Sequence, residues 1–207
     1  DIFVLLSLVG NSETPPPPER FSCPDIIEPL ENTGMLNIYG DSLEKCREDS
    51  NSSDQRGSWD SNGYCSELGG GVHQICFDVN SATKDFSTDT NQSNWSLERE
   101  GKNHCMCIGA WALYKAKQEE GSITPTTNEL KCESIPEISI TNEYINNWNT
   151  WNGNELPDQI VQGVNKLVEQ CYHKETINQE KKQYLKQKYL ELVEDKPEFT
   201  GNTLSLQ

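Results

Sequence analysis

Eight cysteines, spread over most of the chain, constrain this sequence of 207 residues more than any other feature. They are Cys23, Cys46, Cys65, Cys76, Cys105, Cys107, Cys132 and Cys171. An even number of widely spaced cysteines favours disulfides in an oxidising compartment, whereas in the cytosol it favours metal or redox chemistry. Four bridges allow about a hundred connectivities, so the pairing stays open. Cys105 and Cys107 are expected to pair elsewhere rather than with each other, because so short a ring is strained.

The charge balance excludes one class of partner. The chain has 17 Lys and Arg residues against 33 Asp and Glu residues, and its formal net charge is -16 at pH 7. Nucleic-acid binding needs a basic surface that neutralises phosphates, so no nucleic-acid partner is expected. The acidity also favours solubility and disfavours contact with anionic membrane surfaces. With 33% hydrophobic residues, the chain can bury a core, but some segments are expected to be loops or tails.

The N-terminal segment is apolar and precedes a run of four prolines. Residues 1–10 read DIFVLLSLVG, and Pro15 to Pro18 favour an extended polyproline conformation. A bilayer needs roughly 20 apolar residues, so no membrane span is expected here. Two interpretations stay open: an uncleaved remnant of a signal peptide, or a tail that docks onto a protein partner. We expect docking, and its residues are Ile2, Phe3, Val4, Leu5 and Leu6.

Periodicity predicts a small number of strands. Residues 72–79 alternate apolar and polar side chains, which is the strongest strand signal in the chain. Residues 35–40 and 129–140 are predicted as further strands, the second at a sheet edge because it contains Pro136. The polar stretches 47–63 and 80–103 are predicted as loops.

Three helices are predicted in the second half of the chain. One spans about 104–120 and stops at Gly121, a second starts near Pro157, and a third follows a capping box of Thr176 and Gln179. The fold class is therefore α+β: a small cysteine-rich sheet-and-helix core with an extended N-terminal tail and a C-terminal helical hairpin. The predicted domains are an apolar, proline-rich tail (1–34), the cysteine-rich α+β domain (35–145) and a helical extension (146–207).

Three motifs carry a resemblance to a known family: Gly63-Tyr64-Cys65, Gly70 to Cys76, and His104 to Trp111. Over about residues 35–145 the chain resembles the domain of unknown function 2237, an uncharacterised family of bacterial type. The positions that match in order are Leu36-Asn37 to Gly40, Cys46, Cys65, His73, Cys76, Cys105, Cys107 and Trp111. His104 replaces a tryptophan of that pattern, and Cys132 replaces a histidine. The resemblance implies a fold and supplies no activity.

The cysteines support three kinds of chemistry. Disulfides are expected, and Cys23 and Cys171, outside the resemblance, are candidates to pair with each other. Zinc is the alternative, because His73, Cys76, Cys105 and Cys107 offer tetrahedral ligand types, although the Cys-x-Cys spacing is a weak variant. A nucleophilic cysteine beside His73 or His104 is the third possibility. No cofactor is expected, and zinc is the alternative.

Two functions from different classes follow. The first is a non-catalytic accessory or structural subunit of a larger assembly, exported to an organelle lumen or out of the cell. It would dock on protein subunits, including those of a membrane complex, through its N-terminal tail and C-terminal helices. The second is a thiol- or zinc-dependent enzyme or redox protein that uses the cluster of His73, Cys76, Cys105 and Cys107.

Overall fold

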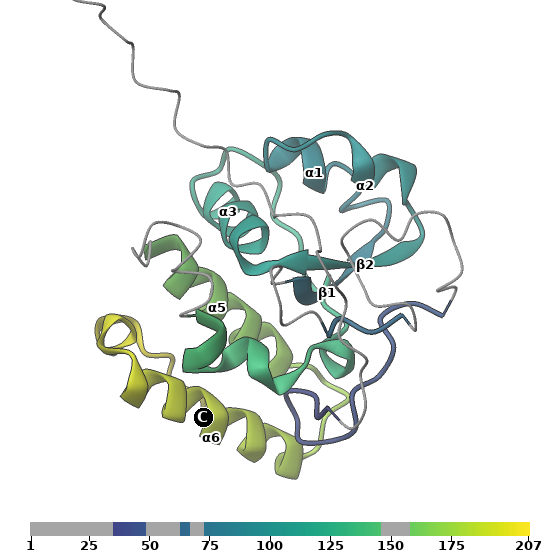
Figure 1. The fold of residues 1–207 in the computed structure, drawn as a ribbon. Coiled ribbons are helices and arrows are strands. Elements are labelled where there is room, and N and C mark those ends of the chain that lie inside the picture. The colour runs from purple at the N-terminus through teal and green to yellow at the C-terminus, as the bar shows by residue number, and fades with distance from the viewer. Residues whose placement is uncertain (1–34, 49–62, 67–72, 146–157) are drawn as a thin grey trace, which may run out of the picture.

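The structure is a computed structural model, and it describes residues 35–48, 63–66, 73–145 and 158–207. In chain order these form β1 (His73–Val79), α1 (Phe86–Asp89), α2 (Trp95–Glu98), β2 (Lys102–Cys107), α3 (Ile108–Glu119), η1 (Cys132–Ser134), η2 (Glu137–Ile140), α5 (Asp158–Tyr172), α6 (Gln179–Asp195) and η3 (Pro197–Asn202), where η marks a 3-10 helix. Figure 1 shows α5 between α3 and α6, with the two strands next to α3. The predicted α+β class is confirmed.

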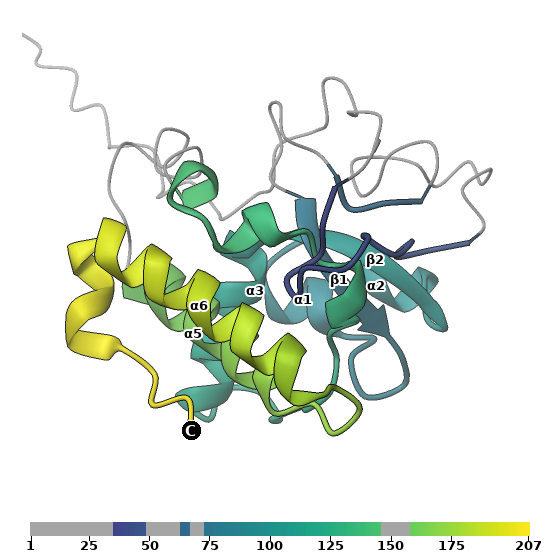
Figure 2. The same ribbon diagram turned by 90° about the horizontal axis from the view of Figure 1, so that it is seen from below.

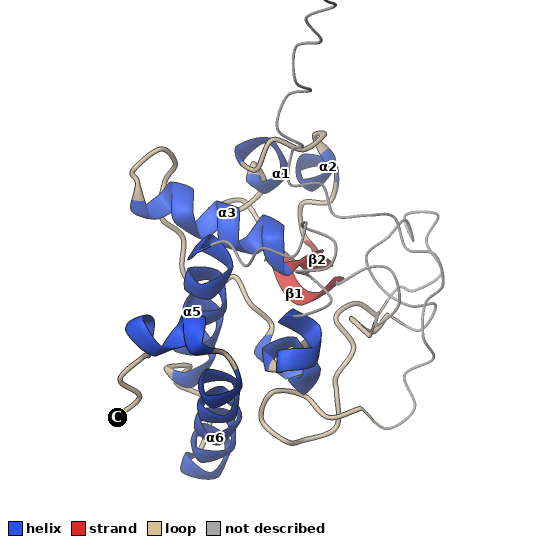
Figure 3. Ribbon diagram, turned by 60° about the vertical axis from the view of Figure 1, so that its left-hand side comes forward, coloured by secondary structure: helices blue, strands red, loops and turns tan. Residues whose placement is uncertain are grey.

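The sheet has two antiparallel strands, β1 and β2. The strand predicted over 72–79 is confirmed from His73 onward. All residues of β1 are buried except the half-buried Asp78, although the sequence alternates. This burial on both faces arises because α3 packs against the strands (Figure 3), while Cys76 is tied to a loop by a disulfide.

The chain changes from strand to helix at Cys107, so the helix predicted over 104–120 is wrong in its first turn. Residues 104–107 pair with β1 as the end of β2. Cys107 has an extended backbone, and its Sγ accepts a hydrogen bond from the backbone N–H of Ala110 at 3.4 Å, which caps α3. The stop is as predicted: α3 ends at Glu119, and Gly121 follows with φ 76°.

The strand predicted over 35–40 does not form. Leu36 and Asn37 make only isolated bridges, to Ser42 and Pro136. The side chain of Asn37 instead fixes a turn, because its Oδ1 accepts the backbone N–H of Tyr39 at 2.9 Å. This competition between an asparagine side chain and the sheet ladder is what disfavours asparagine in strands.

The strand predicted over 129–140 is also wrong, and the segment folds mainly into η1 and η2. Pro136 has no N–H to give to a ladder, and Ser139 Oγ donates to the carbonyl of Pro136 at 2.8 Å. The loop predicted over 80–103 contains α1, α2 and the start of β2.

Helix α5 confirms the predicted apolar stripe and packs on α3. Its buried side chains include Ile160, Val161, Val164, Leu167, Val168 and Cys171. A Cβ at Gly163 would lie 2.6 Å from the Cβ of Ala112, so the two helices are in direct backbone contact there. The indole N–H of the fully buried Trp111 donates to the carbonyl of Gly163 at 2.8 Å.

Helix α6 lies along α5 (Figure 2), and the hydroxyl of Tyr189 donates to Asn165 Oδ1 at 2.8 Å. Its cap is Asn178, whose Oδ1 accepts the N–H of Lys181 at 3.0 Å, and not the predicted box of Thr176 with Gln179. Both helices contribute to the same hydrophobic core as the sheet. The domain boundaries after residues 34 and 145 adjoin residues outside the described ranges and stay a prediction.

Candidate functional site

Two disulfides lie side by side on the sheet. Cys46 bonds Cys76 on β1, and Cys65 bonds Cys105 on β2. Cys76 and Cys105 are directly opposite each other across the strands, yet each is joined to a loop instead. The two loops also meet, because the N–H of Cys46 donates to the carbonyl of Gly63 at 2.9 Å. The two disulfides thus attach both loops covalently to the sheet.

A third disulfide fixes the C-terminal helices. Cys132 of η1 bonds Cys171 near the end of α5, so the expected pairing of Cys171 with Cys23 is wrong. Cys107 is also disulfide-bonded, and Cys105 pairs with Cys65 rather than with it, as predicted. Cys23 lies outside the described residues.

The sulfur atoms clustered at the sheet are oxidised to disulfides and are not metal ligands in this state. The Sγ atoms of Cys46, Cys65 and Cys105 lie within 4.8 Å of one another. These three cysteines are in disulfides, and so are the cysteines of the predicted zinc set, Cys76, Cys105 and Cys107. Zinc binds thiolates and not disulfide sulfurs. In the oxidised state that set therefore offers only the ring of His73. No free thiol is present among the described residues.

The neighbouring His104 is held neutral. Burial lowers its pKa well below the ordinary value, and the charges of Arg99, His73 and Arg47 lower it further. Its Nδ1 accepts from the guanidinium of Arg99 at 2.9 Å, and its ring stacks on Trp95 at a centroid distance of 4.0 Å. The lone pair and one ring face of His104 are thus in use within the fold, which favours a structural role over that of a general base.

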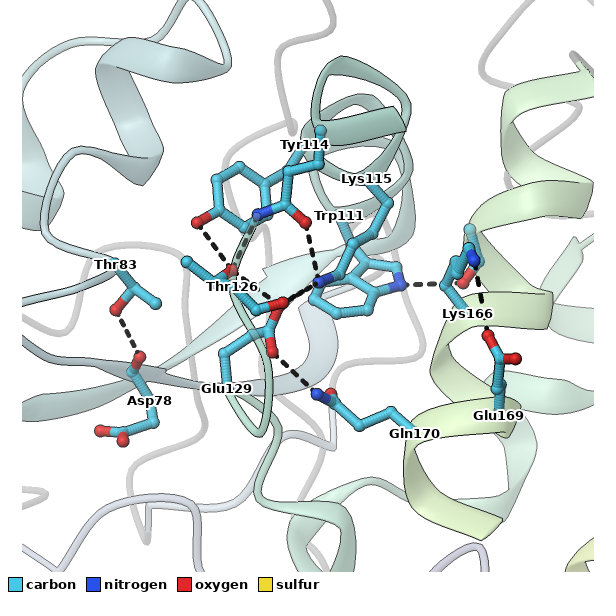
Figure 4. Close-up of polar contacts among 12 residues, drawn as sticks. Asp78, Thr83, Trp111, Tyr114, Lys115, Thr126, Glu129, Lys166, Glu169 and Gln170 are labelled. Carbon is cyan, nitrogen blue, oxygen red and sulfur yellow. Dashed lines mark hydrogen bonds and ion pairs between the residues drawn. The ribbon is translucent and has the colours of Figure 1, made fainter. Parts of the chain in front are cut away.

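A buried ion pair joins α3 to the loop at residues 126–129, and no sequence pattern predicts it. Glu129 is fully buried and bonded to the ammonium of Lys115 on α3 (Figure 4). Gln170 Nε2 on α5 donates to the second oxygen of Glu129 at 2.7 Å, and Thr126 Oγ1 donates to the first at 3.0 Å. The carboxylate therefore joins both helices to the loop at residues 126–129.

The lysine of this pair is fully engaged. Its Nζ also donates to Gln118 Oε1 at 3.0 Å and to the carbonyl of Thr126 at 3.3 Å, and it lies 4.7 Å from the centroid of the Trp111 ring. Burial lowers the pKa of Lys115, and the charge of Glu129 opposes that shift. Lys115 is therefore a paired cation with no donor to spare for a ligand.

A cavity of about 440 Å³ opens above this ion pair. The last turns of α3 and α5 and the intervening loop line it: Lys115, Gln118, Glu119, Pro125, Thr126, Thr127, Asn128, Lys166, Glu169, Gln170 and His173. Lys166 bridges its mouth, with its Nζ 3.1 Å from Glu119 and 3.5 Å from Glu169. The volume lies in the range of small-molecule sites.

The predicted docking residues Ile2, Phe3, Val4, Leu5 and Leu6 lie outside the described residues. Within the described ranges, no helix has the length and apolar character to cross a membrane. No family model, curated protein or solved structure matches the chain.

Proposed function

We propose that the protein is an exported, disulfide-stabilised, non-catalytic accessory or structural subunit of a larger assembly. The observation that carries this is the state of the cysteines: the paired residues are buried, and they bond loops and helices to one core. Such cross-links belong to oxidising compartments, and they consume the thiols that a cysteine nucleophile or a zinc centre would need. The resemblance to the domain of unknown function 2237 is part of this proposal and adds a fold, not an activity.

Counting thiols and metal in the purified chain separates the two functional classes. After denaturation without reductant we expect fewer than one reactive thiol per chain and no bound zinc. Stoichiometric zinc together with three or more thiols would instead support the alternative, a thiol- or zinc-dependent protein that uses His73, Cys76, Cys105 and Cys107.

The described part of the proposed docking surface is the outer face of α6. Leu190 is 46% exposed there, although large apolar side chains are otherwise mostly buried in the described residues. It lines a groove of about 750 Å³ with Val193 and Pro197, and Glu191 and Glu194 form part of the rim. An apolar centre with an acidic rim suits a partner subunit that presents an apolar side chain flanked by lysine or arginine.

Substitution of Leu190 by glutamate tests this surface. In the natural cells, we expect the tagged wild-type chain in a high-mass fraction of a native extract. We expect tagged L190E at the size of the free chain, whose own mass is 23.4 kDa without the tag. Burying a carboxylate against apolar side chains without a partner charge is costly, so the contact should be lost.

The matched control is L97E, because Leu97 on α2 is 43% exposed and lies away from this groove. That variant should stay in the high-mass fraction. If the wild-type chain itself elutes as a free monomer, the subunit proposal is rejected.

A further inference from the structure

The two disulfides at the sheet bring sulfur atoms from different bridges close together. The Sγ atoms of Cys46, Cys65 and Cys105 lie within 4.8 Å of one another, although they belong to two bridges. The fourth sulfur belongs to Cys76, which is bonded to Cys46 and is the register partner of Cys105 in the sheet. In a tetrahedral zinc site with Zn–S bonds of about 2.3 Å, the sulfurs are about 3.8 Å apart. Three of the four sulfurs are therefore already near the spacing that one zinc ion requires.

Contacts other than the disulfides also hold these cysteines in place. The two cysteines of the strands are paired by the sheet ladder. The backbone of Cys46 is fixed on both sides, because its N–H donates to the carbonyl of Gly63 at 2.9 Å and its carbonyl accepts from Nδ2 of Asn103 at 2.7 Å. Gly63 lies two residues before Cys65, so the first of these bonds joins the two loops. Reduction breaks only the sulfur–sulfur bonds, and these contacts then keep the four thiols together.

Burial identifies the kind of metal site that this set can form. Each of the four cysteines is at most 1% exposed. A set closed to water is typical of structural zinc, whereas catalytic zinc keeps one open position. Because the sulfurs are enclosed, zinc would be bound as the chain folds, which couples metal binding to folding. Cys107 is not part of this group of sulfurs and instead caps α3 at the N–H of Ala110.

We propose that the reduced chain holds one zinc ion on four thiolates, those of Cys46, Cys65, Cys76 and Cys105. Each disulfide reaches that state by taking two electrons and two protons from a dithiol, which becomes a cyclic disulfide, and zinc then displaces the four thiol protons. Oxidation by a disulfide-bearing oxidant is the reverse: each pair of thiolates gives up two electrons, the oxidant takes them with two protons from solvent, and zinc leaves. Bound zinc keeps these sulfurs from pairing with other cysteines while the chain folds. The site belongs to the chain before oxidation and does not rest on the subunit role.

Refolding of the full reduced chain tests whether the site forms. The chain is reduced and unfolded, then refolded without oxygen beside a phosphine reductant, with and without zinc chloride. We expect about one zinc ion per chain after gel filtration, and a stronger helical circular dichroism signal with zinc than without it. Cobalt in place of zinc should give the absorption of tetrahedral four-sulfur coordination. No bound metal, or a cobalt spectrum of mixed sulfur and nitrogen ligands, would overturn the proposal.

Two alanine variants identify the ligands. C65A removes a proposed ligand that is absent from the predicted zinc set, and C132A removes a cysteine that belongs to neither set. Both side chains are buried, and in the reduced chain neither variant removes a disulfide. By competition with a chromophoric chelator, C65A should raise the dissociation constant of zinc by more than about 100-fold, since even second-shell changes cost about 10–100-fold. C132A should leave the constant unchanged.

Two results of this comparison would reject the site. Tight zinc binding by C65A would assign the metal to other ligands, and equal weakening by both variants would mean that zinc binds an unfolded, cysteine-rich chain. These outcomes concern the refolded, reduced chain alone. Zinc in the oxidised chain as purified would instead count against the subunit role, so the two proposals fail separately.

Discussion

Replacing Cys132 and Cys171 together by alanine is expected to lower the free energy of unfolding by about 4 kcal/mol. The bridge spans 39 positions of sequence, and its removal returns to the unfolded chain the conformational freedom that the closed loop takes away. Alanine is preferred to serine because both sites are buried and a hydroxyl there would need a partner. Denaturant unfolding under non-reducing conditions measures the loss, and the slope of the unfolding free energy against denaturant concentration should rise, because the unfolded chain is more expanded without the bridge.

The size of the loss distinguishes two ways of holding α5. A loss of less than about 1 kcal/mol would mean that packing of α5 on α3 fixes the helix and that the cross-link adds little. Thiol counting on the variant must still show no free thiol, so that the result reports this bridge and not exchange among the others.

Replacing Glu129 by glutamine is expected to cost about 3–5 kcal/mol of stability. The substitution keeps the shape of the side chain but leaves the ammonium of Lys115 buried without its charge partner. E191Q is the control, because Glu191 faces Lys188 at 3.4 Å on the surface of α6 and such pairs contribute little. Thermal unfolding of both variants against the wild type measures the difference, and equal effects would contradict a special role for the buried pair.

The pH dependence gives this prediction a second readout. Burial lowers the pKa of Lys115 in the folded protein, and loss of Glu129 removes a charge that raises it. When a lysine has a lower pKa folded than unfolded, the unfolded state binds more protons between the two values, so stability rises with pH there. The deficit of E129Q should therefore shrink as the pH rises from 7 toward the ordinary lysine value of about 10.4. A deficit that does not change over this range would exclude an unpaired lysine as its cause.

Long periodic segments could be predicted from the sequence, and short ones could not. The stripe of α5 reflects burial of one helix face, and the residues of β1 alternate in sequence although the strand is buried on both faces, so each pattern can be recognised in one sequence. Lys102–Cys107 lacks such a signal, since it is polar at one end and runs without a break into α3 at Cys107. In 129–140, buried apolar residues such as Ile135 and Ile140 belong to short turns, where tertiary contacts and serine hydrogen bonds outweigh strand propensity.

The candidate site was out of reach of sequence reasoning for a different reason. Lys115 and Glu129 are 14 positions apart, and Gln170 follows 41 positions after Glu129. In a chain with 33 acidic residues, nothing marks Glu129 as the buried one. The disulfide pairing was equally hidden, because Cys76 and Cys105 face each other in the sheet and still take partners from the loops.

The two bridges at the sheet also decide what a protease can do to this chain. In sequence order they interlock, because Cys65 lies inside the loop closed by Cys46 and Cys76, and Cys105 lies beyond it. Any single backbone cut between Cys46 and Cys105 therefore leaves two pieces that at least one bridge still joins. The two pieces produced by a cut between Cys132 and Cys171 stay joined by the bridge between these residues. A nick in either interval changes the fragment pattern on a reducing gel while the oxidised molecule keeps its full mass.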